Sequence, residues 1–208
     1  MIKEVYLIRH SKPLKVNNDK NMDSLQIQNE KQPLSIEGEN IAREKLNIEE
    51  LKDIDKLYSS SYVRAISTAK YIAENNNIEI NIISDFGERK FGINSWDELP
   101  DNFGEKQFLD ENYKTEFGES QKEVRERTFN ALMNVLKSDD KKIAIVFHGT
   151  AMLFLIMTWC KVVPDSDKYK IFFNGNELLW GKHFDFCETF KLTFNDNKLI
   201  DIKNIKHD

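Results

Sequence analysis

The sequence predicts an α/β fold with three α/β/α layers around a mostly parallel, doubly wound sheet and an antiparallel edge. Short apolar runs at residues 5–8, 56–59 and 143–147 are typical of strands. Amphipathic helical patterns separate these runs. A chain that alternates strand and helix builds a parallel sheet through right-handed crossovers. We expect a single domain over residues 1–208.

The first run, residues 5–8, is apolar on consecutive positions, as in a parallel strand buried on both faces. Arg9 and His10 follow directly, where the strand should leave the sheet, and Pro13 prevents regular continuation. The polar, Asn-rich residues 15–32 predict a long loop.

Helix start signals precede the other patterns. Ser35 should cap the helix in "SIEGENIAREKLNIEEL", and Ser60 or Ser61 should cap the helix after the second strand. In "GESQKEVRERTFNALMNVLK", Ser120 and Glu123 predict a capping box. A fourth helix should open after the third strand, at "GTAMLF".

Two segments depart from the alternation. Residues 86–118 mix aromatic, acidic and glycine residues, which predicts a lid-like insertion over one sheet edge. Its aromatics are expected to pack within the lid rather than form a substrate box: Phe91, Trp96, Phe103 and Phe108. The tail alternates apolar and polar residues around "NDN", which predicts an antiparallel hairpin at the sheet edge.

The overall composition limits the classes of partner. A net charge of −5 argues against a binder of nucleic acid or of membrane surfaces. Cys160 and Cys187 form no disulfide framework, which favours a reducing compartment. The first apolar run is too short for a signal peptide, and residues 151–160 are too few to span a bilayer. We therefore expect a cytoplasmic protein.

The strand ends carry the residues that suggest chemistry. In an open parallel sheet, ligands bind at the carboxyl ends of the strands. Arg9, His10 and His148 follow two of these strands, and Arg64 lies about one turn into the helix after another. Converging cations require an anion, and the arginine fork matches phosphate oxygens. Gly149 opens a helix whose backbone N–H groups suit a phosphate.

Five motifs resemble, in order, those of the histidine phosphatase superfamily, the phosphoglycerate-mutase-like fold. They are "LIRHSKP", "SSSYVRAISTA", "GERKFG", "GES" and "VFHGTA". The segment "PLSIEGENIA" also looks like a helix start of this family. The resemblance covers nearly the whole chain.

The resemblance implies a metal-independent phosphatase that hydrolyses phosphate monoesters through a phosphohistidine on His10. Arg9, Arg64 and His148 would then hold the phosphate oxygens together with Gly149, and Glu88 in "GERKFG" would protonate the leaving oxygen. Such residue types suit the reaction, because a neutral imidazole is a good nucleophile and an alkoxide leaves poorly without an acid. The expected partner is a small phosphorylated substrate, and no metal or other cofactor is expected.

Two alternatives for the activity remain: a phosphoglycerate-mutase-type phosphotransferase, and a non-catalytic relative that binds phosphorylated ligands. Ser11 replaces the family's glycine after the nucleophile, as in smaller phosphatase branches. The mutases hold the substrate carboxylate with an Arg-Arg pair, whereas the cations of this insertion are scattered: Arg89, Lys90, Lys106 and Lys114. This difference argues against mutase activity.

Two site assignments also have rivals. Asp85, Asp97 and Glu98 lie near Glu88 in the sequence and are alternative acids. A zinc site at His183, Asp185 and Cys187 is disfavoured, because we expect these residues in a strand-like segment without a fourth ligand.

Overall fold

The structure is a computed structural model that describes residues 1–16, 24–165, 168–181 and 183–206. Its main sheet has six strands in the order β3-β2-β4-β1-β8-β9. Four of them run parallel: β1 (Ile2–Arg9), β2 (Lys56–Ser59), β3 (Ile80–Ile82) and β4 (Lys142–Phe147). The hairpin of β8 (Thr189–Asn195) and β9 (Lys198–Ile205) joins antiparallel to β1. The predicted fold class and edge hairpin are confirmed.

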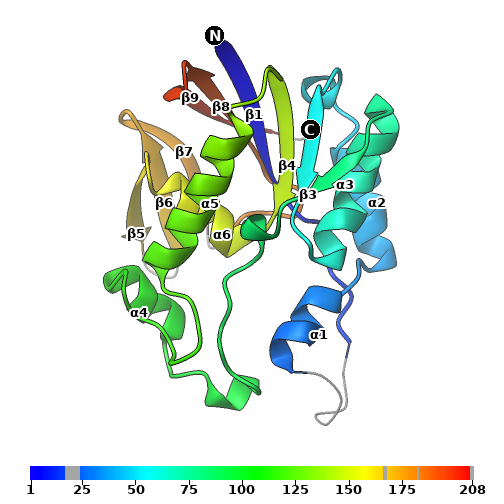
Figure 1. Ribbon diagram of the computed structural model, residues 1–208. Coiled ribbons are helices and arrows are strands. Elements are labelled where there is room, and N and C mark those ends of the chain that lie inside the picture. Colours follow the sequence, from blue (N-terminus) through cyan, green and yellow to red (C-terminus); the bar gives the residue numbers. More distant parts are fainter. Residues whose placement is uncertain (17–23, 166–167, 182, 207–208) are drawn as a thin grey trace.

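Helices cover both faces of this sheet (Figure 1). The helices α2 (Ile36–Lys45) and α3 (Val63–Asn76) cover one face, and α5 (Gln121–Val135) and α6 (Gly149–Ile156) cover the other. Side chains of β1 alternate between the two cores, with Val5 and Leu7 on the α5 side and Tyr6 and Ile8 on the α3 side. A strand buried on both faces needs apolar residues at every position, which explains the continuous run.

Three of the predicted helix starts are confirmed. The Ser35 side chain accepts a hydrogen bond from the Gly38 N–H at 3.0 Å and caps α2. Ser120 and Glu123 form the predicted capping box of α5. Helix α6 begins at Gly149. Each of these caps joins residues that are near neighbours in the sequence, so its formation does not depend on the rest of the fold.

The predicted cap of α3 is wrong. The N-cap is Tyr62, and its side chain makes no capping hydrogen bond. Ser60 Oγ lies 2.8 Å from Nε2 of His148 and is 3.4 Å from the Tyr62 nitrogen. A contact with a distant residue therefore replaces the expected local cap.

Two elements were not foreseen. Residues 15–32, predicted as a loop, contain the helix α1 (Leu25–Lys31), while residues 17–23 lie outside the described part of the chain. A second, antiparallel sheet of three strands contains β5 (Lys161–Asp165), β6 (Lys168–Phe173) and β7 (Asn176–Gly181). Ile171 of β6 is fully buried in the core on the α6 side. This apolar anchor joins the second sheet to the main body of the fold.

Residues 86–118 and α1 lie beyond the carboxyl ends of the parallel strands (Figure 1). The first segment contains the short 3₁₀ helix η3 (Trp96–Glu98) and α4 (Phe103–Leu109), and another 3₁₀ turn, η2 (Ser84–Phe86), precedes it. The Phe91 ring contacts those of Trp96 and Phe103, with centroids 5.0 and 6.0 Å apart. These contacts favour the expected packing role for the aromatics. A further 3₁₀ helix, η1 (Glu49–Leu51), precedes β2.

Candidate active site

His10 follows the last residue of β1 and is held against β4. Its backbone N–H donates to the Phe147 carbonyl at 2.9 Å, and its side chain is only 5% exposed. Nδ1 lies 2.7 Å from the Ser11 carbonyl oxygen, which can only accept, so Nδ1 carries the proton. Nε2 accepts a hydrogen bond from Arg64 Nε at 3.0 Å. The lone pair needed for nucleophilic attack is therefore on Nε2.

The environment keeps His10 neutral. Burial lowers its pKa well below the ordinary value for histidine, and the neighbouring charges of Arg64 and Arg9 lower it further. The hydrogen bond to the Ser11 carbonyl raises the pKa, but its effect is smaller than that of burial and that of the Arg64 charge. A neutral imidazole at neutral pH is the nucleophilic form.

Arg64 is the second residue of α3 and links both histidines. Besides the bond to His10, its Nη2 lies 3.2 Å from His148 Nδ1, and its Nη1 donates to the Asn29 carbonyl of α1. The guanidinium also lies over the Tyr62 ring, 4.8 Å from its centroid. These contacts fix the planar fork at the carboxyl ends of β1 and β4.

His148 is the N-cap residue of α6 and is fully buried. Because Arg64 can only donate, Nδ1 of His148 accepts, and its Nε2–H donates to Ser60 Oγ. Burial, followed by the charge of Arg64, lowers the pKa of His148 well below the ordinary value. The neutral ring and the Asn29 carbonyl of α1 thus accept from different nitrogens of the Arg64 guanidinium.

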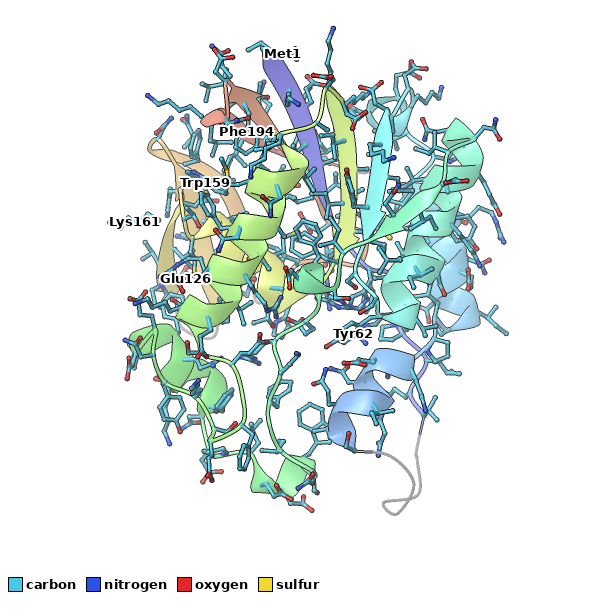
Figure 2. The ribbon with its side chains drawn as sticks, in the orientation of Figure 1. Met1, Tyr62, Glu126, Trp159, Lys161 and Phe194 are labelled. Carbon is cyan, nitrogen blue, oxygen red and sulfur yellow. The ribbon has the colours of Figure 1, made fainter. Side chains whose placement is uncertain are left out.

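Tyr62, labelled in Figure 2, lies between α3 and α1 and contacts both His148 and Gln26 of α1. Its ring packs on His148 at a centroid distance of 4.4 Å. Its hydroxyl lies 2.9 Å from Gln26 Nε2 and 3.5 Å from the Glu88 carbonyl oxygen. Burial raises the pKa of Tyr62 to about 12, so the hydroxyl keeps its proton. Sequence reasoning missed Tyr62, because an aromatic residue before a helix carries no distinctive signal.

Arg9 presents an unusual donor. Its Nη1 donates to the Phe184 carbonyl, and its guanidinium lies over the Phe186 ring, 4.8 Å from the centroid. Its buried Nε has no hydrogen-bond partner within the described residues. A Cβ at Gly149 would lie 3.3 Å from this Nε, so the bare glycine leaves room for the arginine. A buried cationic donor without an acceptor is suited to an incoming anion.

Glu88 occupies the N-terminus of α6. Its Oε1 accepts from the N–H groups of Arg89 at 2.9 Å and Ala151 at 3.0 Å, and its Oε2 accepts from Thr150 at 3.3 Å. A carboxylate at this end of a helix is favoured by the backbone dipoles. The backbone groups predicted to bind phosphate thus hold a carboxylate of the protein itself.

A cavity of about 140 Å³ opens at Arg9, His10 and Glu88, whereas Arg64 and His148, also predicted to bind phosphate, are not among the residues that line it. Its lining consists of Arg9, His10, Glu88, Gly149, Thr150, Leu153, Tyr169, His183 and Phe184. Glu88 is the one carboxylate among the described residues that line it. The alternative acids, Asp85, Asp97 and Glu98, are exposed and outside this lining. Tyr169 comes from the unforeseen second sheet, and sequence reasoning missed it.

The zinc alternative rested on a wrong expectation of a strand. Residues 183–188 form irregular chain between β7 and β8. Within the described ranges, no three His, Cys, Asp or Glu side chains gather as metal ligands. Likewise, no helix in these ranges is both long and apolar enough to cross a membrane.

The structure resembles solved structures over nearly its whole length. A mycobacterial glucosyl-3-phosphoglycerate phosphatase matches with a TM-score of 0.72 and 17% identity, covering 98% of this chain and 97% of that one. Its complex with inorganic phosphate matches at 0.68 and 15% identity, covering 98% and 96%. A phosphoglycerate mutase from Bacillus anthracis matches at 0.64 and 19% identity, covering 98% and 92%. At these identities the likeness concerns the fold alone.

The sequence itself matches a family. Among curated protein sequences, none matches this chain. The model of the histidine phosphatase superfamily (branch 1), however, matches residues 5–175, most of the 208 in the chain. The chain therefore belongs to the histidine phosphatase superfamily.

Proposed function

We propose that the protein is a metal-independent phosphatase that hydrolyses small phosphate monoesters through a phosphohistidine on His10. The observation that supports this most directly is the imidazole of His10, whose Nδ1 donates to the Ser11 carbonyl and whose Nε2 lone pair accepts from Arg64 Nε. The chain belongs to the histidine phosphatase superfamily and its structural neighbours include a phosphatase, and in this site Nε2 of His10 is the atom able to attack phosphorus.

In the first step, Nε2 of His10 attacks the phosphorus atom and a P–N bond forms. The P–O bond to the leaving group breaks, and its electron pair goes to the leaving oxygen, which takes a proton from Glu88. Arg9, Arg64, His148 and the first N–H groups of α6 would stabilise the charge on the three remaining oxygens.

In the second step, water attacks the phosphohistidine. The P–N bond breaks, its electron pair returns to Nε2, and the ionised Glu88 takes the proton of the water. Inorganic phosphate leaves with His10 and Glu88 restored. Residues 86–118 would act as a lid over this site, since they lie beyond the strand ends (Figure 1).

The contacts of the cations in residues 86–118 argue against the mutase alternative. The Arg89 guanidinium lies over the rings of Phe91 and Phe103, at 4.5 and 5.2 Å from their centroids. Lys114 pairs with Glu123 at 2.6 Å. Neither lines the cavity at His10, where a mutase would hold the carboxylate of its substrate.

The test is release of phosphate from a panel of phosphate monoesters, with and without a chelator, using His10→Ala as the control. We expect activity that persists in the chelator, is inhibited by vanadate and is abolished by His10→Ala. Activity lost in the chelator and restored by a divalent ion would overturn the mechanism. Phosphoryl exchange on phosphoglycerate without net hydrolysis would indicate a mutase. Tight phosphate binding without any turnover would indicate a non-catalytic relative.

A further inference from the structure

Arg127 lies in α5, is not among the described residues that line the cavity, and uses its whole guanidinium. Nε and Nη2 donate to the two carboxylate oxygens of Glu119 at 2.7 and 2.9 Å. Nη1 donates to the carbonyls of Asp85 at 2.6 Å and Gly87 at 3.0 Å, and Nη2 donates to the Glu88 carbonyl at 3.2 Å. An arginine has five N–H donors, and the structure offers five acceptors. The side chain is 18% exposed.

The three carbonyls belong to the turn that carries Glu88. Residues 85–88 leave η2 without entering a strand, so their carbonyls have no partner in a sheet ladder. Glu119 also holds Lys90, two residues after Glu88, because its Oε2 accepts from the Lys90 N–H and its own N–H donates to the Lys90 carbonyl, both at 2.9 Å. The main chain around Glu88 is therefore held to α5 by charge-assisted hydrogen bonds.

Glu88 is thus held at both ends. Its carboxylate meets the N–H groups of α6, and its carbonyl meets Arg127 of α5. Phe86, fully buried against Phe147 at a centroid distance of 5.7 Å, prevents the turn from rotating. A proton donor needs this precision, since a misplacement of about 1 Å can cost on the order of 10² in rate.

We propose that Arg127 is the positioning residue of the proton-transfer step: it sets the turn that aims the Glu88 carboxyl at the leaving oxygen. This inference rests on the proposed function, in which Glu88 is the acid. Arg127 is not among the described residues that line the cavity, and its hydrogen bonds go to Glu119 and to the turn that carries Glu88. Its charge also lowers the pKa of His148, but by less than burial, Arg64 and His10 do. Its removal should therefore slow only those reactions that need the acid.

The test compares Arg127→Met with Arg125→Met, a matched control on the same helix. Arg125 contacts Gln121 and Glu111 but none of residues 85–88. For each variant, the rate of His10 phosphorylation is measured with an alkyl phosphate and with an activated aryl phosphate. For Arg127→Met we expect a loss of about 10- to 100-fold with the alkyl substrate and less than about 3-fold with the aryl substrate. Arg125→Met should leave both rates within about 3-fold.

Two further variants distinguish a role of Arg127 in positioning Glu88 from a general effect on the stability of the fold. In a Glu88→Gln background, Arg127→Met should cause no additional loss with the alkyl substrate, because both changes remove the same step. Arg127→Lys keeps the charge and three donors, so it should restore part of the alkyl rate. An equal loss with both substrates, or additive losses in the double variant, would overturn the inference.

A readout that does not depend on activity is amide hydrogen exchange at Thr150 and Ala151. Glu88 accepts from both N–H groups, so Arg127→Met should speed their exchange and Arg125→Met should not. Unchanged exchange in Arg127→Met would contradict the positioning role even if the protein turned over no ester.

The kinetic results also distinguish failure of this inference from failure of the proposed function. If the rate loss in Glu88→Gln does not depend on the leaving group, the acid assignment in the proposed function fails. If the rate loss depends on the leaving group in Glu88→Gln but not in Arg127→Met, only the inference about Arg127 fails.

Discussion

The Nε atom of Arg64 donates a hydrogen bond of 3.0 Å to Nε2 of His10. The proton of the imidazole is on Nδ1, which donates to the Ser11 carbonyl. The same nitrogen that would attack phosphorus is thus the one that Arg64 contacts. A phosphate that enters must take over the Arg64 donors, and this exchange would free the lone pair at the moment the phosphorus atom arrives.

This relationship predicts a large effect of Arg64→Ala on phosphate ester hydrolysis. Removing a preorganised charge partner should lower kcat/KM by on the order of 10² or more. Arg64→Lys should recover little, because an ammonium cannot contact His10, His148 and the phosphate at once. Steady-state kinetics with Arg43→Ala, an exposed arginine on α2, as the control measure the effect. A change in kcat/KM below about 3-fold for Arg64→Ala would contradict the assignment.

The buried histidines predict a loss of stability in mild acid. Burial lowers the pKa of His10 and of His148 well below the ordinary 6.5 in the folded protein. Below about pH 6.5 the unfolded chain takes up protons that the folded chain does not, so the free energy of unfolding falls as the pH falls. Each histidine can contribute at most about 1.4 kcal/mol per pH unit.

Urea unfolding between pH 5 and pH 8 measures this dependence. Replacing one of the two histidines, as in His10→Ala, should flatten the decline below pH 6.5 by removing one titrating group. A decline equally steep in His10→Ala and in the parent protein would show that other groups control the acid sensitivity.

Ser11, which replaces the family's glycine, predicts an effect on stability rather than on chemistry. Its Oγ donates to the Gly38 carbonyl at 2.7 Å, so the hydroxyl is directed at α2. Ser11→Ala should lower the free energy of unfolding by about 1 kcal/mol through the lost hydrogen bond. Ser11→Gly should lower it somewhat more, because glycine adds freedom to the unfolded chain. Both variants should keep kcat within about 3-fold, and a much larger loss in Ser11→Ala would place the hydroxyl in the reaction.

The close packing of Gly38 predicts a steric effect of substitution near His10. An added Cβ would lie 2.0 Å from the backbone oxygen of Lys12, two residues after His10. Gly38→Ala should therefore destabilise the fold by about 1–3 kcal/mol or more, and the displaced loop should lower kcat/KM. Gly104→Ala in α4 is the matched control, since nothing lies within 4 Å of its added Cβ. There the better helix former should raise stability by up to about 1 kcal/mol. Equal effects of the two changes would contradict the steric argument.

The features of this protein that depend on contacts between near neighbours along the chain could be predicted from its residues. The apolar run at residues 5–8 predicted β1 and with it the place of His10 at a strand end. The caps at Ser35 and Ser120 could be predicted because a capping side chain contacts the N–H group three positions along the chain. Parallel strands end at one edge of a sheet, so the convergence of His10, Arg64 and His148 could also be predicted.

Tertiary structure alone decided the contacts that join distant segments. Ser60 was predicted as a helix cap, but its hydroxyl instead contacts His148, which is 88 residues away in the sequence. Arg127 carried no signal, because an arginine on a helix is usually solvated and its acceptors are carbonyls 39 to 42 residues away. Carbonyls occur at every residue, so no sequence pattern marks the three that this arginine binds. Strand ends and caps follow from local periodicity, whereas the direction of the Glu88 carboxyl depends on contacts that only the packed fold sets.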